Sequence, residues 1–307
     1  MAHVYDCIVI GGGPAGLSAA IYVARFNRSV LVLDQKRGRS SYPQINENYL
    51  GFPSGVMARK LRRLGRIQAE RFGVIFSFAC VESITFLEGL FTIKGQSEET
   101  FDSHSLILAT GVVDLFPGFE AYRECVGRSL FWCITCDGFK TINKRIIVVG
   151  ATEDSATTAL QFLQFTPHIT FLTNQKLGAT RISDKQKASF DDHGIKFMEG
   201  VIKDVASEAG MVHSLYLEDG SCLETDYVFS HQGALPHSKL AKELGVKVNE
   251  AGYIEVDSEQ RTSHPHVYAA GDVTKLHSHQ IATAVHEGSM AGQAANYDLY
   301  LPEQKMS

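Results

Sequence analysis

The chain has 307 residues, which is enough for two domains that each bury a core of their own. Hydrophobic residues make up 44% of the chain and charged residues 21%, proportions that are ordinary for a soluble globular protein. The net charge of −5 and the lack of a basic run of five or more residues give no indication of a nucleic-acid partner. No apolar stretch approaches the roughly 20 residues that span a bilayer, so we expect no membrane partner.

The strand pattern of Tyr5 to Ile10 begins so early that no signal peptide is expected, and we expect a cytoplasmic protein. Of the six cysteines, only Cys133 and Cys136 are close together, in a CxxC motif. Such a motif is typical of a redox dithiol or of half a zinc site. A structural zinc site usually needs a second close pair of ligands, so we expect no metal. The remaining cysteines are expected to be small, buried apolar residues: Cys7, Cys80, Cys125 and Cys222.

A nucleotide-binding pattern follows the first predicted strand. The β-branched run of residues 6–10 predicts a buried parallel strand, and an apolar helical stripe begins after Pro14. Gly11, Gly13 and Gly16 fit GxGxxG between this strand and helix, where glycines allow a tight turn and close approach of a pyrophosphate. The next predicted strand ends at Asp34, 18 residues after Gly16, where an acid can bind a ribose hydroxyl. We therefore expect a bound dinucleotide.

Two later segments favour FAD over NAD as that dinucleotide. One predicted strand ends in Ala109-Thr110-Gly111, and another ends in Gly271-Asp272. Together with the first turn, and in this order, they resemble the flavoproteins that contain two dinucleotide-binding domains. The resemblance implies that Asp272 holds the ribityl chain of the flavin. It also implies that the first domain is discontinuous and is closed by a C-terminal segment.

The dithiol narrows the resemblance. Cys133 to Gly138 reads Cys-Ile-Thr-Cys-Asp-Gly, which is the pattern of the thioredoxin reductase family of low molecular weight. Two thiols at this spacing can close a small disulfide, and the setting lowers the pKa of one thiol so that its thiolate attacks near neutral pH. Asp137 could move a proton to or from that thiolate. The resemblance assigns Cys136 to the flavin side and Cys133 to exchange with a thioredoxin-like protein. Further likeness lies in residues 47–53, 68–73 and 280–282.

The resemblance also implies an α/β fold with two Rossmann-like dinucleotide-binding domains, the second inserted in the first. We expect a FAD-binding domain of residues 1–114 and 236–307, an NADPH-domain-like insert of residues 115–235 that carries the CxxC motif, and a homodimer. The residues expected to bind FAD are Gly11, Gly13, Pro14, Ala15, Gly16, Asp34, Gln44, Asn48, Val81, Ala109, Thr110, Gly111, Gly271, Asp272, His279, Gln280 and Ile281.

The second domain is predicted to contain a strand–helix–strand unit, with strands over 144–149 and 168–172, but its turn departs from an NADPH site. NADPH-using relatives carry a Gly-x-Gly-x-x-Ala turn, whereas here Gly150 is followed by Ala151 and Thr152. Side chains then occupy the path along which backbone must approach a pyrophosphate. Glu153 stabilises its own helix start but repels a phosphate in the same place.

A second departure from an NADPH site follows the next strand. NADPH-using relatives place a His-Arg-Arg cluster there, which grips the 2′-phosphate. This chain has Thr173 to Ala179, a segment without arginine, although Lys176 and Arg181 are nearby. Bidentate recognition of a phosphate by a guanidinium group is therefore missing. We expect that NADPH is not used.

A branch of this family lacks pyridine-nucleotide binding and is similar to this chain in both departures. It contains ferredoxin-linked thioredoxin reductases and diflavin-linked disulfide oxidoreductases, in which a second FAD lies beside the first. In the diflavin type, Tyr42 and Tyr49 are candidates for stacking on the second flavin, because flat aromatic faces stack at little conformational cost. Ferredoxin or another electron carrier is the alternative donor. His279, which replaces an arginine of many relatives, would tune the flavin or carry protons.

The leading hypothesis is an enzyme that moves two electrons between a bound flavin and the Cys133–Cys136 pair, and onward to or from a thioredoxin-like protein. One alternative is an ordinary NADPH-dependent thioredoxin reductase. Another is a non-catalytic redox sensor in which the CxxC motif switches a protein interface. The acid at Asp137 argues against the sensor, which would not need it.

Overall fold

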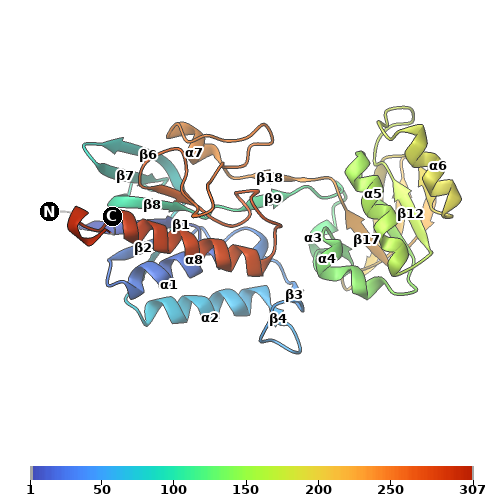
Figure 1. The fold of residues 1–307 in the computed structure, drawn as a ribbon. Helices are drawn as coiled ribbons and strands as arrows, with labels where there is room; N and C mark the ends of the chain where they lie inside the picture. Colours follow the sequence, from blue (N-terminus) through green and yellow to red (C-terminus); the bar gives the residue numbers. More distant parts are fainter. Residues whose placement is uncertain (1–2, 306–307) are drawn as a thin grey trace. The chain divides into compact units, whose positions relative to one another are not determined.

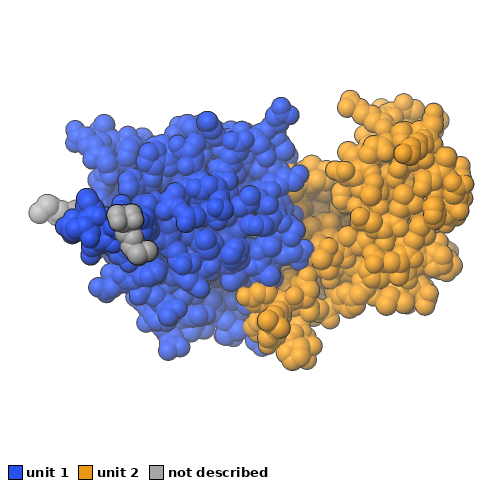
Figure 2. Space-filling model, viewed as in Figure 1, with its two compact units in different colours: residues 1–41, 56–113, 235–307 blue, residues 42–55, 114–234 orange. Residues whose placement is uncertain are grey.

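The computed structural model describes residues 3–305, which form two compact units (Figure 2). Unit 1 contains the chain up to residue 41, residues 56–113 and the chain from residue 235 onward. Unit 2 contains residues 42–55 and 114–234. The expected FAD-binding domain of residues 1–114 and 236–307 includes the segment 42–55, which here groups with unit 2. These residues group with unit 2 because the ring of Tyr42 packs on Phe116 and Trp132.

Unit 1 is built on a seven-stranded sheet with the order β5-β2-β1-β8-β7-β6, in which β19 also pairs with β8 (Figure 1). Strands β1, β2, β5, β8 and β19 are parallel, and the β6–β7 hairpin adds an antiparallel edge. The strand bounds are β1 Val4–Ile10, β2 Val30–Leu33, β4 Val56–Met57, β5 Ile75–Ser77, β6 Val81–Leu87, β7 Leu90–Gly95, β8 Thr100–Leu108 and β19 Val267–Ala269. The predicted strand over 6–10 is confirmed, as are the predicted strands that end at Asp34, at 109–111 and at 271–272, although the observed strands differ from them by a few residues at their ends.

The helices of unit 1 are α1 Pro14–Arg25, α2 Ala58–Glu70, α7 Lys239–Glu243 and α8 Ile281–Asp298, with 3-10 turns η1 Arg39–Ser41 and η4 Pro302–Gln304. Helices α1 and α8 lie side by side (Figure 1). Their contact depends on small residues, because a Cβ on Gly288 would stand 2.1 Å from the carbonyl oxygen of Ala15. The Ser18 hydroxyl also donates a hydrogen bond of 2.7 Å to the Val285 carbonyl. This packing ties the C-terminal helix to the helix that starts at the glycine turn.

Unit 2 contains a parallel sheet of order β10-β17-β11-β12-β13 and an antiparallel sheet of order β14-β15-β16. The strand bounds are β3 Ile45–Asn46, β10 Leu130–Phe131, β11 Ile146–Val149, β12 Ile169–Leu172, β13 Lys196–Met198, β14 Ile202–Glu208, β15 Met211–Leu217, β16 Cys222–Glu224 and β17 Tyr227–Ser230. The helices are α3 Tyr122–Cys125, α4 Ile134–Asp137, α5 Glu153–Gln161 and α6 Asp184–Asp192, with 3-10 turns η2 Gly138–Thr141 and η3 Phe162–Gln164. The predicted strand–helix–strand unit is confirmed as β11, α5 and β12. Two further strands carry the chain between the units, β9 Val112–Asp114 and β18 Ala234–Pro236.

Two of the cysteines expected to be buried are not. Cys7 in β1 and Cys125 in α3 are buried, but Cys80 is half-buried and Cys222 is exposed. Cys222 begins the edge strand β16, whose alternating pattern turns that side chain to solvent. No helix within residues 3–305 combines the length and the apolar character needed to cross a bilayer.

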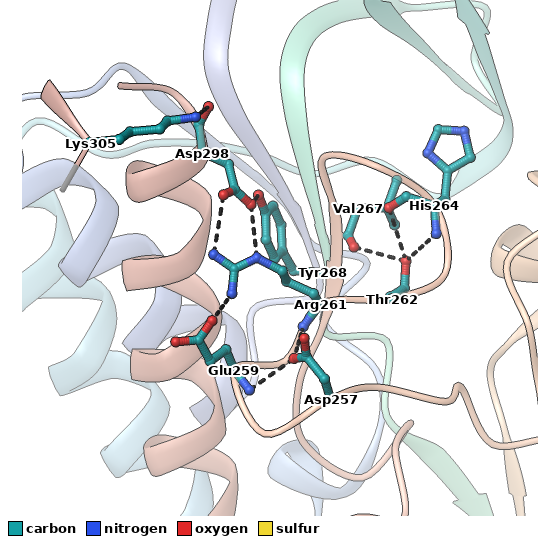
Figure 3. Close-up of polar contacts among 9 residues, drawn as sticks. All are labelled: Asp257, Glu259, Arg261, Thr262, His264, Val267, Tyr268, Asp298 and Lys305. Carbon is teal, nitrogen blue, oxygen red and sulfur yellow. Dashed lines mark hydrogen bonds and ion pairs between the residues drawn. The ribbon is translucent and has the colours of Figure 1, made fainter. Parts of the chain in front are cut away.

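A polar cluster fastens the end of α8 to the loop that precedes β19 (Figure 3). The Arg261 guanidinium donates from Nε and Nη2 to the two oxygens of Asp298, at 3.0 and 3.1 Å. The buried hydroxyl of Tyr268 donates to the same carboxylate at 2.6 Å, and Arg261 also pairs with Glu259. Burial alone would raise the pKa of Asp298, but its hydrogen bonds and ion pair with Arg261 and its hydrogen bond from Tyr268 outweigh this and lower the pKa.

Replacing Asp298 with alanine is expected to destabilise unit 1 by about 2–3 kcal/mol, because it leaves a buried tyrosine hydroxyl without its acceptor and breaks a bidentate ion pair. A depressed pKa stabilises the fold above the unfolded value of about 3.9, and this stabilisation disappears as the pH falls through the folded value. The difference between parent and variant should therefore be full at neutral pH and shrink in acid. Thermal unfolding of the parent and the variant, at neutral pH and again in acid, measures this difference.

The matched control is Tyr268→Phe, which removes one hydrogen bond and leaves the ion pair of Asp298 intact. It should cost about 1 kcal/mol, less than the loss of the carboxylate. Equal melting temperatures for the parent and Asp298→Ala at neutral pH would contradict the role given to this cluster.

Candidate functional site

The glycine turn between β1 and α1 requires glycine at two positions. Gly11 has a φ of +111°, and a Cβ there would stand 2.2 Å from the carbonyl oxygen of Ala109. A Cβ on Gly16 would stand 1.9 Å from the carbonyl oxygen of Gly11. Gly13, by contrast, faces open space and directly precedes α1, which begins with Pro14. The turn therefore packs tightly against its own unit and leaves room at the start of α1, as a bound pyrophosphate needs.

Asp34 lies beside this turn, at the end of β2. Its carboxylate is 2.7 Å from the place that a Cβ on Gly12 would take, and it accepts a hydrogen bond of 3.0 Å from the Lys36 amide. The structure thus brings the predicted ribose-binding acid to the glycine turn. Its position at the carboxyl end of a parallel strand is where open α/β sheets bind ligands.

The Ala109-Thr110-Gly111 segment follows β8, the neighbour of β1. The Ala109 amide donates to the Ile10 carbonyl at 2.8 Å, which continues the pairing of these strands up to the glycine turn. The Thr110 hydroxyl donates to the His237 carbonyl at 2.7 Å, and Gly111 has a φ of +67°. The predicted residue Val81 begins β6 in the same sheet and is half-buried.

The Gly271-Asp272 turn also lies at this end of the sheet. A Cβ on Gly271 would stand 2.8 Å from the Cβ of Ala15, so the turn touches the start of α1. The Asp272 carboxylate forms an ion pair of 2.7 Å with Arg39. His279 lies 3.2 Å from the Thr274 carbonyl through Nε2, while Gln280 and Ile281 form the start of α8.

Glu287 is a residue of this site that the sequence interpretation missed. It is 3% exposed, and its carboxylate accepts hydrogen bonds from the Gly271 amide at 2.6 Å and the Thr274 hydroxyl at 3.2 Å. Nδ1 of His277 lies 2.9 Å from its other oxygen. The sequence offers one signal for this role. Glu287 lies next to Gly288 on the small-residue face of α8, and a carboxylate buried there needs hydrogen-bond donors. Glu287 therefore fixes the turn that presents Asp272.

These residues fit FAD. The carboxyl ends of the parallel strands β1, β2, β8 and β19 bring together a glycine-rich turn, Asp34 beside it, and Asp272 after β19. The residues that would hold the dinucleotide are those of the glycine turn, with Asp34 for the adenosine ribose and Asp272 for the ribityl chain. Each of them lies in unit 1.

The dithiol lies in unit 2 and forms a disulfide. Cys133 and Cys136 are bonded to each other, with Cα atoms 5.3 Å apart. Cys133 precedes α4 as its N-cap residue, and its Sγ accepts a hydrogen bond of 3.1 Å from the Cys136 amide. Both cysteines are half-buried. Within residues 3–305, no group of three or more His, Cys, Asp or Glu side chains is arranged to hold a metal ion.

Asp137 follows Cys136 directly and is buried, with 2% of its surface exposed. Burial raises the pKa of its carboxyl group, although an ion pair of 2.8 Å with Lys140 opposes this rise. An acid that holds its proton more strongly than usual is suited to exchange a proton with a nearby thiolate.

Four further predicted residues belong to the segment 42–55, in the same unit as the disulfide. The Tyr42 ring contacts Phe116 and Trp132 edge to face, with centroids 6.2 and 5.6 Å apart. Tyr49 stacks on Phe52 at 6.0 Å. The remaining predicted residues of the segment are Gln44, which is buried, and Asn48, which is exposed. Both tyrosine rings therefore pack on aromatic rings of the protein.

The second nucleotide turn, between β11 and α5, is closed by its own side chains. The Thr152 hydroxyl accepts from the Ser155 amide at 3.2 Å, and the Ser155 hydroxyl accepts from the Thr152 amide at 2.9 Å. This reciprocal capping box satisfies amides that a phosphate would otherwise use. A Cβ on Gly150 would stand 2.3 Å from the Cβ of Ser155, so the serine fills the space beside this glycine.

Glu153 and the segment after β12 form hydrogen bonds with other parts of unit 2. The Glu153 carboxylate accepts a hydrogen bond of 2.7 Å from the amide of Ser183, the N-cap residue of α6. After β12, the Asn174 side chain accepts from the Ile202 amide at 2.8 Å. The two nearby cations, Lys176 and Arg181, are exposed.

Comparison with known proteins supports this description. Residues 5–288 match the family described as pyridine nucleotide-disulphide oxidoreductase. A thioredoxin reductase from Bacillus subtilis is 30% identical over 303 residues, covering 96% of this chain and 94% of its own. The crystal structure of thioredoxin reductase from Streptococcus pyogenes has a TM-score of 0.89 and 26% identity, covering 97% of this chain and 99% of its own.

A second solved structure is more similar in sequence than the Streptococcus pyogenes enzyme, and it is of an atypical thioredoxin reductase. It is the atypical thioredoxin reductase TRi from Desulfovibrio vulgaris Hildenborough, 34% identical with a TM-score of 0.53, covering 95% of this chain and 97% of its own. The expected fold class is confirmed: an α/β fold of the thioredoxin reductase type, with Rossmann-like FAD/NAD(P)-binding architecture. The chain belongs to the pyridine nucleotide-disulphide oxidoreductase family and is a flavoprotein disulfide oxidoreductase related to the thioredoxin reductases.

Proposed function

We propose that this enzyme exchanges two electrons between FAD, held by unit 1, and the Cys133–Cys136 disulfide, and then between that pair and a thioredoxin-like protein, without using NADPH. The relatives named thioredoxin reductase support the thioredoxin-like partner. The proposal that NADPH is not used rests on the capping box of Thr152 and Ser155, whose side chains occupy the backbone amides of the second nucleotide turn.

Charge supports the same proposal. Glu153 and Asp154 are both exposed in the first turn of α5. A phosphate placed there would meet carboxylate charge, and two like unit charges about 4 Å apart cost about 4 kcal/mol at an effective dielectric near 20. This cost offsets much of the affinity of a dinucleotide. The lack of arginine in residues 173–179 removes the usual counter-charge for a 2′-phosphate.

The cysteines and Asp137 carry the exchange chemistry. Bound FAD supplies two-electron redox chemistry at the flavin side of the disulfide. Cys136 is the flavin-side cysteine, and the Cys133 thiolate attacks a disulfide of the partner protein. Asp137 gives and takes the proton that accompanies thiolate formation.

Either a second flavin or a protein carrier such as ferredoxin would replace NADPH as the electron source. Because Tyr42 and Tyr49 already pack on Trp132, Phe116 and Phe52, the protein carrier needs fewer rearrangements than a stacked second flavin. From the resemblance to thioredoxin reductases, we also propose that the enzyme is a cytoplasmic homodimer.

Flavin content and anaerobic reduction test this function. We expect the visible spectrum of bound FAD, bleaching by a dithiol, and no bleaching by micromolar NADPH over the same period. One FAD per chain would favour the protein carrier, and two would favour the diflavin alternative. Rapid bleaching by micromolar NADPH would contradict the proposal and establish an ordinary NADPH-dependent thioredoxin reductase, the function suggested by the names of the relatives.

A further inference from the structure

Lys140 lies in a cluster of charged and aromatic groups that includes Asp137, the residue that follows Cys136. Its Nζ is 2.8 Å from Oδ1 of Asp137 and 3.2 Å from Oε2 of Glu47. The same ammonium group lies over the rings of Phe131 and Phe139, 5.0 and 5.6 Å from their centroids. The Lys140 side chain is 21% exposed. Its ammonium group is therefore mostly shielded from water and is held by two carboxylates and two aromatic faces.

Two carboxylates share this one ammonium group, which makes the cluster neutral when one carboxyl group holds a proton. The Asp137 side chain is 4% exposed and that of Glu47 is 40% exposed, so burial disfavours the charged form of Asp137. Within residues 3–305, the charges that act on the pKa of Asp137 are those of Lys140, which lowers it, and Glu47, which raises it along with burial. Burial alone would lower the pKa of Lys140, but hydrogen bonds and charge from Asp137 and Glu47 raise it. Lys140 therefore stays charged throughout the neutral range.

We propose that Lys140 is a positioning residue for disulfide exchange: it fixes the carboxyl group of Asp137, the residue next to Cys136 in the chain, and together with Glu47 it sets the pH at which that group passes on its proton. The inference rests on the proposed role of Asp137. A dithiol reductant such as dithiothreitol breaks the Cys133–Cys136 bond and becomes a cyclic disulfide, so that two electrons and two protons reach the two cysteines. Asp137 passes one of these protons to Cys136 and takes up another from solvent.

Two substitutions that should act in opposite directions test this inference. Lys140→Met removes the positive charge, so the Asp137 pKa should rise by about one unit or more. Glu47→Gln removes a negative charge, so the Asp137 pKa should fall. Lys140→Arg keeps the charge and should restore parent-like behaviour. Carbon-13 NMR of aspartate-labelled, oxidised holoenzyme follows the Asp137 carboxyl group directly, and Asp137→Asn identifies its resonance.

The exchange itself is measured in the same proteins. Reduction by dithiothreitol is quenched in acid at a series of pH values, and the Cys133 and Cys136 thiols are counted by alkylation and peptide mass spectrometry. The pH midpoint of the exchange rate should move up in Lys140→Met and down in Glu47→Gln, as the Asp137 pKa does. The inference would be overturned if the Asp137 pKa were unchanged in both variants. It would also be overturned if the pH dependence of the exchange rate did not shift with that pKa. Because neither measurement uses NADPH or a protein donor, failure of the proposed electron route leaves this test intact.

Discussion

Replacing Cys136 with serine is expected to abolish electron exchange between the flavin and the dithiol while leaving FAD bound. The Cys133–Cys136 disulfide cannot form in this variant, so Cys133 has no partner within the motif. The glycine turn, Asp34 and Asp272, which we expect to hold FAD, lie in unit 1, and the cysteine lies in unit 2. Anaerobic addition of a dithiol, followed by flavin absorbance, should therefore show bleaching in the parent and none above background in the variant.

Cys222→Ser is the matched control, because Cys222 is an exposed, unpaired cysteine of the edge strand β16 in the same unit. It should bleach at the parental rate and hold the parental amount of FAD. If Cys136→Ser were reduced as fast as the parent, the assignment of this cysteine to the flavin side would be wrong.

Replacing Gly16 with alanine is expected to prevent FAD binding by disrupting the turn itself. The new Cβ would stand 1.9 Å from the Gly11 carbonyl oxygen, and backbone cannot yield to this contact as a flexible side chain can. We expect a destabilisation of about 3 kcal/mol or more, and flavin-free protein after purification. The measurements are thermal unfolding and the ratio of FAD to protein.

Gly13→Ala separates folding from binding at the same turn. Apart from its two chain neighbours, no residue among 3–305 lies within 4 Å of its added Cβ, and the φ of −80° suits alanine. The variant should unfold like the parent as apoprotein, yet bind FAD at least about tenfold more weakly, a loss of about 1.4 kcal/mol. Parental FAD affinity in Gly13→Ala would show that the open space at this turn is not where the dinucleotide lies.

Local sequence patterns predicted the strand–turn–helix of unit 1 and the strand–helix–strand of unit 2. These elements are short in sequence, and their buried strands are runs such as Val30–Leu33 and Ile146–Val149, in which each side chain is buried. Close contacts with Ala109 and Gly11 explain why glycine is needed at Gly11 and Gly16. Patterns of this kind can be read locally, because the residues that specify them are neighbours in the chain.

Long-range packing could not be read in the same way. Residues 42–55 group with unit 2 through rings more than 70 residues away in sequence, such as Phe116, and no periodicity signals this. Glu287 accepts a hydrogen bond from the Gly271 amide, 16 residues earlier in the chain. Only the folded turn shows that this carboxylate has hydrogen-bond donors. The partnership of Lys140 with Glu47 likewise joins distant segments.

The second turn shows what structure adds to a motif that departs from its family. The sequence indicates side chains where a pyrophosphate needs backbone, but not what those side chains do. The hydrogen bonds between Thr152 and Ser155 show that the start of α5 is capped from within. This capping supports the proposal that NADPH is not used, and it does so independently of the missing arginines.

Direct binding of NADPH to the oxidised holoenzyme tests the central claim most directly. Calorimetric titration, together with crystals soaked in millimolar NADPH, should give no measurable heat and no dinucleotide density near residues 150–156. An NADPH molecule lying against that turn, with its pyrophosphate at the start of α5, would contradict the account.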